Sequence, residues 1–331
     1  KDVSLSTSIL SDAKRLIEER NYVRARALLL ETPIEVRKSD AELGNTLLTC
    51  CIHLRESQEG LRLADSVIRS AQDGGNEVVS RQAKLAKATF LSRLGDLTNA
   101  EASLSECMEG MDWLAVTKFV AAANNLLGTI QAMRGTWNPA IAHFKRALTQ
   151  YQTLGNTFGV ACCNHNLGLS HRYNGFYEIS DIFFQTASEY FQYKGTLHER
   201  VFTEGERSLA VLGLGDARRA EAMARLALDR CERLNNQDFV GGISRILGTV
   251  LLEKGAVDEA KHLLSKARQI AHEGSNQQLA AEADEQLAKL FDRLGNPIAK
   301  QHLAAASAYY ESIGATWFVD QLHSIRGRPG V

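Results

Sequence analysis

The sequence predicts an all-α fold: a right-handed α-α superhelix of about eight helix-turn-helix units with a C-terminal capping helix. Three observations support this fold class. The chain has only four prolines among 331 residues, and no stretch of strand length alternates polar with β-branched residues. Small residues also recur every forty positions, which is typical of a repeat array. Because one helical hairpin cannot bury its own apolar side, we expect successive units to stack.

Glycine marks the expected turn inside each unit, and a small residue follows five positions later until Lys300 breaks that series. The turn glycines are Gly95, Gly135, Gly175, Gly215, Gly255 and Gly295, and the small residues are Ala100, Ala140, Ser180, Ala220 and Ala260. Two further series keep the same register, namely Cys107, Ala147, Ala187, Ala227, Ala267, Ser307 and Ala88, Gly128, Gly168, Ser208, Gly248, Ala288. Only such small residues let two helix backbones approach closely, so we place the helix crossings at these positions. A leucine at one of them should overpack the crossing, whereas we expect Gln150 to tolerate leucine.

A second turn is expected where each second helix ends, because left-handed backbone there favours glycine or asparagine. The residues in question are Gly75, Gly155, Gly195, Asn235 and Ser275. The sequence thus predicts a single solenoid over residues 1–331. Its approximate units are 1–34, 35–75, 76–115, 116–155, 156–195, 196–235, 236–275 and 276–315, and a capping helix and tail follow at 316–331.

The best-marked unit carries Leu127, Gly128, the turn glycine Gly135, and then Ala140, Phe144 and Ala147. This pattern resembles the tetratricopeptide repeat (TPR), and the resemblance covers nearly the whole chain. It is weaker at the start, where Arg55 takes the place of the turn glycine. Units of forty residues exceed the usual length of about thirty-four. They resemble the long units of kinesin light chains, of polarity adaptors, and of the sensor arrays in large bacterial maltose-regulator-type transcription activators.

Composition narrows the class of partner. The 38 Lys and Arg residues balance 39 Asp and Glu, so no general positive field exists to attract nucleic acid, and no direct nucleic-acid partner is expected. No apolar run approaches the ~18 residues that span a bilayer, and no leader pattern opens the chain, so we expect a soluble cytoplasmic protein without membrane contact. The chain begins with Lys1 rather than Met, which slightly favours a segment of a longer polypeptide with an effector domain linked outside it.

No catalytic, cofactor or metal motif stands out. The chain lacks a phosphate-binding loop, an H-E-x-x-H sequence and a nucleophile elbow. Cys162 and His165 share one helix face but offer two ligands where a metal site needs three or four. The six cysteines lie inside helical patterns and are interpreted as reduced core residues. We therefore expect no enzyme, no cofactor and no metal.

The resemblance to TPR proteins implies that first helices line a concave face that holds an extended peptide. The matching residues of this chain are Asn124, Asn125, Thr129, Asn164, His165, Asn166, Arg172, Arg245 and Thr249. Asparagine suits this role because its side chain both donates to and accepts from a peptide backbone, and the arginines can pair with a ligand carboxylate. The alternative, strongest for Asn124 and Asn164, is that the amides join adjoining units.

The sequence therefore predicts a module that binds a protein or peptide ligand. We expect it to be the sensor or partner-recognition part of a larger bacterial transcription or signalling protein. Two alternatives stay open, a free-standing scaffold or adaptor and a helical enzyme with an unrecognised site.

Overall fold

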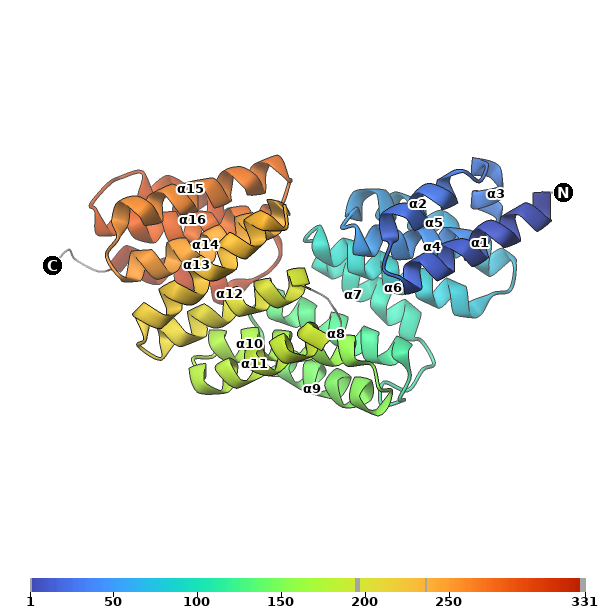
Figure 1. Ribbon diagram of the computed structural model, residues 1–331, viewed down its shortest axis with the longest axis horizontal. Helices are drawn as coiled ribbons and strands as arrows, with labels where there is room; N and C mark the ends of the chain where they lie inside the picture. The colour runs from blue at the N-terminus through green and yellow to red at the C-terminus, as the bar shows by residue number, and fades with distance from the viewer. Residues whose placement is uncertain (1, 194–196, 236, 328–331) are drawn as a thin grey trace. The chain divides into compact units, whose positions relative to one another are not determined.

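The computed structural model describes residues 2–193, 197–235 and 237–327, and these residues form helices and turns without a strand (Figure 1). Most helices pair through a short turn. The first helices of the pairs are α1 (Asp2–Glu18), α4 (Ala41–His53), α6 (Glu77–Arg93), α8 (Lys118–Met133), α10 (Thr157–Tyr173), α12 (Leu197–Gly213), α14 (Gln237–Glu253) and α16 (Gln277–Arg293). The second helices are α2 (Tyr22–Leu30), α5 (Ser57–Asp73), α7 (Leu97–Met108), α9 (Trp137–Thr153), α11 (Tyr177–Tyr193), α13 (Ala217–Arg233), α15 (Val257–Glu273) and α17 (Ala299–Ser312).

The chain divides into two compact units, unit 1 over Lys1–Ala115 and unit 2 over Val116–Val331. Unit 1 holds α1 to α7, including the short α3 (Ile34–Ser39), and unit 2 holds the later helices. The predicted all-α fold of helix-turn-helix pairs is confirmed. One continuous array over 1–331 stays a prediction.

Side chains cap the N-termini of several helices. Asn156 and Asn276 precede α10 and α16, and their side-chain oxygens accept hydrogen bonds from the backbone of Gly159 and Leu279. At the turns between helices the backbone is left-handed, with φ of +77° at Gly135 and +89° at Gly215, for example. The expected second series is left-handed too at Gly75, Gly155, Asn235 and Ser275, while Gly195 lies outside the described residues.

Small residues stand at the helix crossings. Ala140 and Ala147 are fully buried, and a Cβ atom added to Gly128 would lie 2.7 Å from the ring of Phe144. The second helix therefore inserts its aromatic ring into the space that glycine leaves on the first helix. One expectation was wrong: position 150 is not one that should tolerate leucine. The side chain of Gln150 is buried, and its oxygen accepts a hydrogen bond from the amide of Asn124 across the pair.

In unit 2 the first helices pack against one another from pair to pair, α8 on α10, α10 on α12, α12 on α14 and α14 on α16. Each second helix packs on its own first helix and, from α9 to α15, on the next one. The first helices thus form a continuous row. We call one surface of this row the inner face; it carries Asn125, Asn166, Arg172, Glu206 and Arg245. Its residues come from helices that the forty-residue period makes equivalent.

The chain ends with α18 (Thr316–His323) and a 3-10 turn, η1 (Ser324–Gly327), as a capping helix should; residues 328–331 of the predicted tail lie outside the described residues. All six cysteines are free thiols, and only Cys162 is partly exposed. Burial raises the pKa of Cys107 to about 12, as expected of a core residue. No described helix is long and apolar enough to cross a membrane.

Candidate functional site: the inner face of unit 2

Asn124 and Asn164 point into the helix pairs rather than out of them. The amide of Asn124 donates to the backbone oxygen of Val120 at 3.3 Å and to the side-chain oxygen of Gln150 at 3.1 Å. The amide of Asn164 donates to the backbone oxygen of Val160 at 2.8 Å. Both asparagines are buried. These hydrogen bonds lie within one helix pair and within one helix, so both amides take part in packing, whereas the alternative expected them to join adjoining units.

Asn125, His165 and Asn166 connect neighbouring first helices. The amide of Asn166 donates to the side-chain oxygen of Asn125 at 3.1 Å, and Nδ1 of His165 lies 2.9 Å from the hydroxyl of Thr203. Asn125, His165 and Asn166 remain partly exposed. Thr129 and Thr249 contribute less, because each hydroxyl donates to the backbone four residues earlier in its own helix.

Four charged side chains form a chain of ion pairs across the inner face, which we call the charge ladder. Arg172 of α10 pairs with Glu206 of α12 at 3.1 Å, and Arg245 of α14 pairs with the other oxygen of Glu206 at 2.7 Å. Arg245 also pairs with Glu282 of α16 at 3.0 Å. The side chains of Glu206 and Arg245 are only 4% and 7% exposed, so the ladder is removed from bulk water.

Glu206 and Glu282 were not predicted as site residues. Glu206 stands forty residues after Asn166, so the repeat period itself could have found it. The signal was missed because Arg207 and Ser208 replace the Leu-Gly pair that marks this place in other units. Glu282 has no such marker, and its role depends on contacts that only the folded chain brings together.

Burial and charge act against each other in the ladder. Burial alone would raise the pKa of Glu206, but Arg245 and Arg172 outweigh it, so the pKa lies below its ordinary value and the carboxylate stays ionised. At Glu282 burial dominates and raises the pKa. Burial also lowers the pKa of His165 to about 4, so this imidazole is neutral at pH 7. A buried ladder of this kind costs desolvation, so stability alone is a poor reason for it.

Five aromatic side chains adjoin the ladder, and we call them the aromatic cluster: Trp137, Tyr173, Tyr310, Trp317 and Phe318. Trp137 stacks on Tyr173 with ring centroids 4.7 Å apart, and Trp317 meets Trp137 edge-on at 5.2 Å. Phe318 stacks on Tyr310 at 4.7 Å. The guanidinium of Arg172 lies 4.2 Å from the centre of the Tyr173 ring and so joins the cluster to the ladder.

Two buried donors at this junction have no hydrogen-bond partner among the described residues. They are Nε1 of Trp137 and Nε of Arg172. Buried polar atoms without partners are uncommon in folded proteins, and each costs free energy. They mark a place where an acceptor group from a ligand would be favourable.

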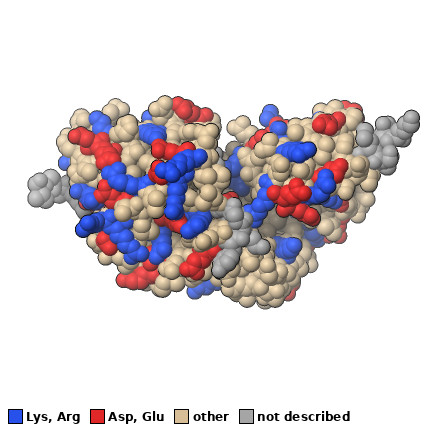
Figure 2. Space-filling model, in the orientation of Figure 1, with Lys and Arg blue, Asp and Glu red and all other residues tan. Residues whose placement is uncertain are grey.

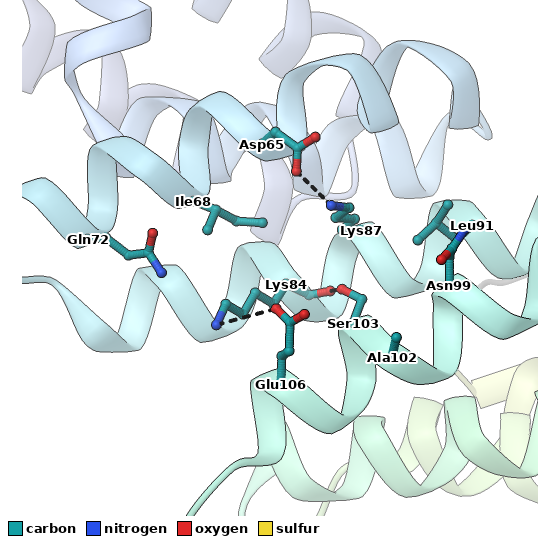
Figure 3. A pocket seen from close by; sticks show the side chains of 10 residues that line it. All are labelled: Asp65, Ile68, Gln72, Lys84, Lys87, Leu91, Asn99, Ala102, Ser103 and Glu106. Carbon is teal, nitrogen blue, oxygen red and sulfur yellow. Dashed lines mark hydrogen bonds and ion pairs between the residues drawn. The ribbon is translucent and has the colours of Figure 1, made fainter.

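Unit 1 contains a separate pocket of about 510 Å³ between α5, α6 and α7 (Figure 3). Its lining residues are Asp65, Ile68, Gln72, Lys84, Lys87, Leu91, Asn99, Ala102, Ser103 and Glu106. The charges in it are paired, Lys87 with Asp65 at 2.7 Å and Lys84 with Glu106 at 3.8 Å. The pocket thus offers a ligand no charge that is not already paired. Figure 2 likewise shows basic and acidic side chains mixed over one face of both units.

Comparison with solved structures places the fold among TPR-like helical repeat proteins. A Rap protein complexed with competence and sporulation factor matches with a TM-score of 0.67 and 14% identity over 97% of each chain. NprR in complex with its cognate peptide NprX matches at 0.61 and 12%, covering 87% of this chain and 83% of that one. A STAND protein with a tetratricopeptide repeat sensor from Pyrococcus horikoshii matches at 0.62 and 12%, covering 97% of this chain and 51% of that one.

No protein-family model and no curated protein matches the chain. The similar structures share the TPR-like fold, and their low sequence identities carry the comparison no further than the fold.

Proposed function

We propose that unit 2 binds an extended peptide or protein segment on its inner face. The observation that carries this proposal is that Asn125, Asn166 and Arg172, on neighbouring first helices, have more hydrogen-bonding capacity than their contacts use. The side-chain oxygen of Asn125 accepts from the amide of Asn166 and from Sγ of Cys163, which leaves the amide donors of Asn125 and the side-chain oxygen of Asn166 for a peptide backbone.

Two similar folds support a peptide as the ligand class. One is the Rap protein complexed with competence and sporulation factor, and the other is NprR with its peptide NprX. We further propose that the chain works in the cytoplasm as the sensor or partner-recognition part of a bacterial regulatory protein, with its effector region linked outside this segment. The six free cysteines support a reducing compartment.

Binding rather than catalysis is the activity that we propose. Both carboxylate oxygens of Glu206 accept hydrogen bonds from arginines, which leaves this group poorly suited to act as a base. Recognition of a peptide needs no such group, because hydrogen bonds to the ligand backbone supply affinity and neighbouring pockets supply specificity.

Selection of binders from a random heptapeptide library, with the full chain as bait, tests this function. The double variant Asn125→Ala/Asn166→Ala should bind the selected peptides at least about tenfold more weakly, which corresponds to roughly 1.4 kcal/mol. The matched control, Gln152→Ala/Gln269→Ala, removes two exposed amides from the second helices α9 and α15 and should bind normally. If the inner-face variant binds normally but unfolds much earlier, the amides only join units and the proposal is wrong.

A further inference from the structure

The last helix of unit 2 lies on side chains from its first two helix pairs. A Cβ atom at position 135, in the turn between α8 and α9, would lie 2.6 Å from Cβ of Trp317. Gly135 therefore allows both the left-handed turn and the direct seating of α18. Trp317 and Phe318 of α18 contact Trp137 of α9 and Tyr173 of α10 at centroid distances between 5.2 and 6.0 Å.

α18 is eight residues long, shorter than any of the paired helices. It follows Gly314, whose φ is +70° and around which an added Cβ would meet no atom within 4 Å. Ala315 precedes the helix and provides no side-chain cap, and Leu322 is its only buried residue. The side chains of Trp317 and Phe318 are partly exposed. The left-handed glycine turn and the uncapped start also occur at α17, so the short length and the single buried residue are what mark α18 as a segment that opens locally before the rest of the fold.

The surface under α18 keeps hydrogen-bond donors that α18 does not satisfy. The two donors without partners, Nε1 of Trp137 and Nε of Arg172, belong to residues of the aromatic cluster and of the charge ladder beside it. α18 brings aromatic rings to this place, which exclude water, but neither donor finds an acceptor. A segment that supplied a ring together with a backbone carbonyl or a carboxylate would fill the same space and satisfy these donors.

We propose that α18 is a removable plug over an aromatic subsite formed by Trp137, Tyr173 and Tyr310, and that a peptide carrying an aromatic side chain takes its place. The peptide part of this inference rests on the proposed function. The plug part depends only on the contacts of α18. While α18 is in place, it shields Arg172 and the other residues of the charge ladder from an incoming peptide. When α18 opens, the end of the inner face at Arg172 becomes accessible.

Hydrogen exchange on the unmodified full chain is the first test, and it needs no variant. The backbone amides of α18 should exchange at least about tenfold faster than those of α17, because α18 opens on its own. Exchange of α18 as slow as that of α17 would show that the helix leaves only on global unfolding, and the plug would be wrong.

The second test uses a synthetic peptide with the sequence of α18, TWFVDQLH, as the probe. The full-length double variant Trp317→Ala/Phe318→Ala vacates the subsite and should bind the labelled peptide at least about tenfold more tightly than the unmodified chain does, as measured by fluorescence anisotropy. A peptide with both aromatic residues replaced by alanine should not bind. The control variant Ile182→Ala/Leu226→Ala, which truncates side chains that are 63% and 50% exposed, should behave like the unmodified chain.

Equal binding to the vacated and unmodified chains, or binding that requires two copies of the chain to associate, would overturn the inference. The two proposals fail in different ways. If library peptides bind the unmodified chain and α18 never opens, the inner face binds peptides without a plug. If the α18 peptide fills the vacated subsite and the library yields no binder, the plug stands and the peptide-binding function does not.

Discussion

Asn124 and Asn125 are neighbours in sequence and have opposite environments. Successive residues of a helix are turned by about 100°, so Asn124 faces α9 and is buried, whereas Asn125 faces α10 and is partly exposed. The forty-residue period marked both positions, since a period identifies equivalent places and not the direction of a side chain. The structure therefore separates a packing amide from an amide of the inner face.

Truncation of these two residues should have different costs. Asn124→Ala removes the buried hydrogen bond to the side-chain oxygen of Gln150 and should lower the free energy of unfolding by about 2 kcal/mol. Asn125→Ala removes a partly exposed hydrogen bond and should cost under about 1 kcal/mol. Urea unfolding measures both. Equal losses would contradict the assignment of the two amides to different roles.

His165 should make stability depend on pH. Its pKa is lowered from 6.5 to about 4 by burial, with Arg172 of the same helix also lowering it and Glu206 of α12 opposing. The unfolded chain therefore binds more protons between these values, so this contribution to stability is complete above pH 6.5 and is lost as the pH falls toward 4.

Between pH 7 and pH 5 the unmodified chain should lose about 2 kcal/mol more unfolding free energy than His165→Gln does. The variant is the control because His53, whose pKa is also lowered to about 4, contributes to both proteins. Urea titrations at the two pH values give the difference. Identical pH dependence in the two proteins would mean that His165 is not held neutral.

At the scale of helices, the small residues set the distance between partners in a pair. Ala140→Leu or Ala147→Leu should overpack the crossing of α8 and α9 and cost about 1 to 3 kcal/mol in chemical denaturation. Ala142→Leu is the matched control, since Ala142 lies on the same helix and is exposed. Comparable losses at all three positions would show that the assigned register is wrong.

The charge ladder links four first helices through Glu206. Glu206→Gln keeps the size of the side chain but removes the charge between Arg172 and Arg245, so it should cost about 3 kcal/mol because Arg172 loses its ion pair and the buried Arg245 keeps only Glu282. Glu259→Gln, in an ion pair whose glutamate is 46% exposed, should cost under about 1 kcal/mol. A small effect of Glu206→Gln in thermal and urea unfolding would mean that the ladder is solvated.

Most of the fold could be predicted from the sequence because it is periodic. The turn glycine and the small residue of each pair, such as Gly135 and Ala140, recur at the spacing that the geometry of a helix pair requires. Half of the charge ladder could be predicted. Arg172 and Arg245 were expected at the site, but Glu206 was not, because the Leu-Gly pair that marks its position in other units is absent there. The aromatic cluster could not be predicted, because Trp137 and Trp317 are 180 residues apart and no repeat relates them.

At the scale of the whole molecule, unit 2 gathers its candidate site from the start and the end of its own sequence. α9 and α10 supply Trp137, Arg172 and Tyr173, and α17 and α18 supply Tyr310, Trp317 and Phe318. A ligand bound here would contact both ends of unit 2 at once, so its binding should be coupled to the state of α18. The pocket of unit 1 lies apart from this arrangement in sequence and has its charges already paired.

The most direct test of the inner-face site is hydrogen exchange on the full chain with and without a library-selected peptide. Binding on the inner face should slow exchange in the first helices α8, α10, α12, α14 and α16, which carry Asn125, Asn166, Glu206, Arg245 and Glu282 in turn. It should leave the second helices α11, α13 and α15 unchanged and speed exchange in α18. Protection confined to those second helices, or to the pocket of α5, α6 and α7 in unit 1, would contradict the site proposed for this protein.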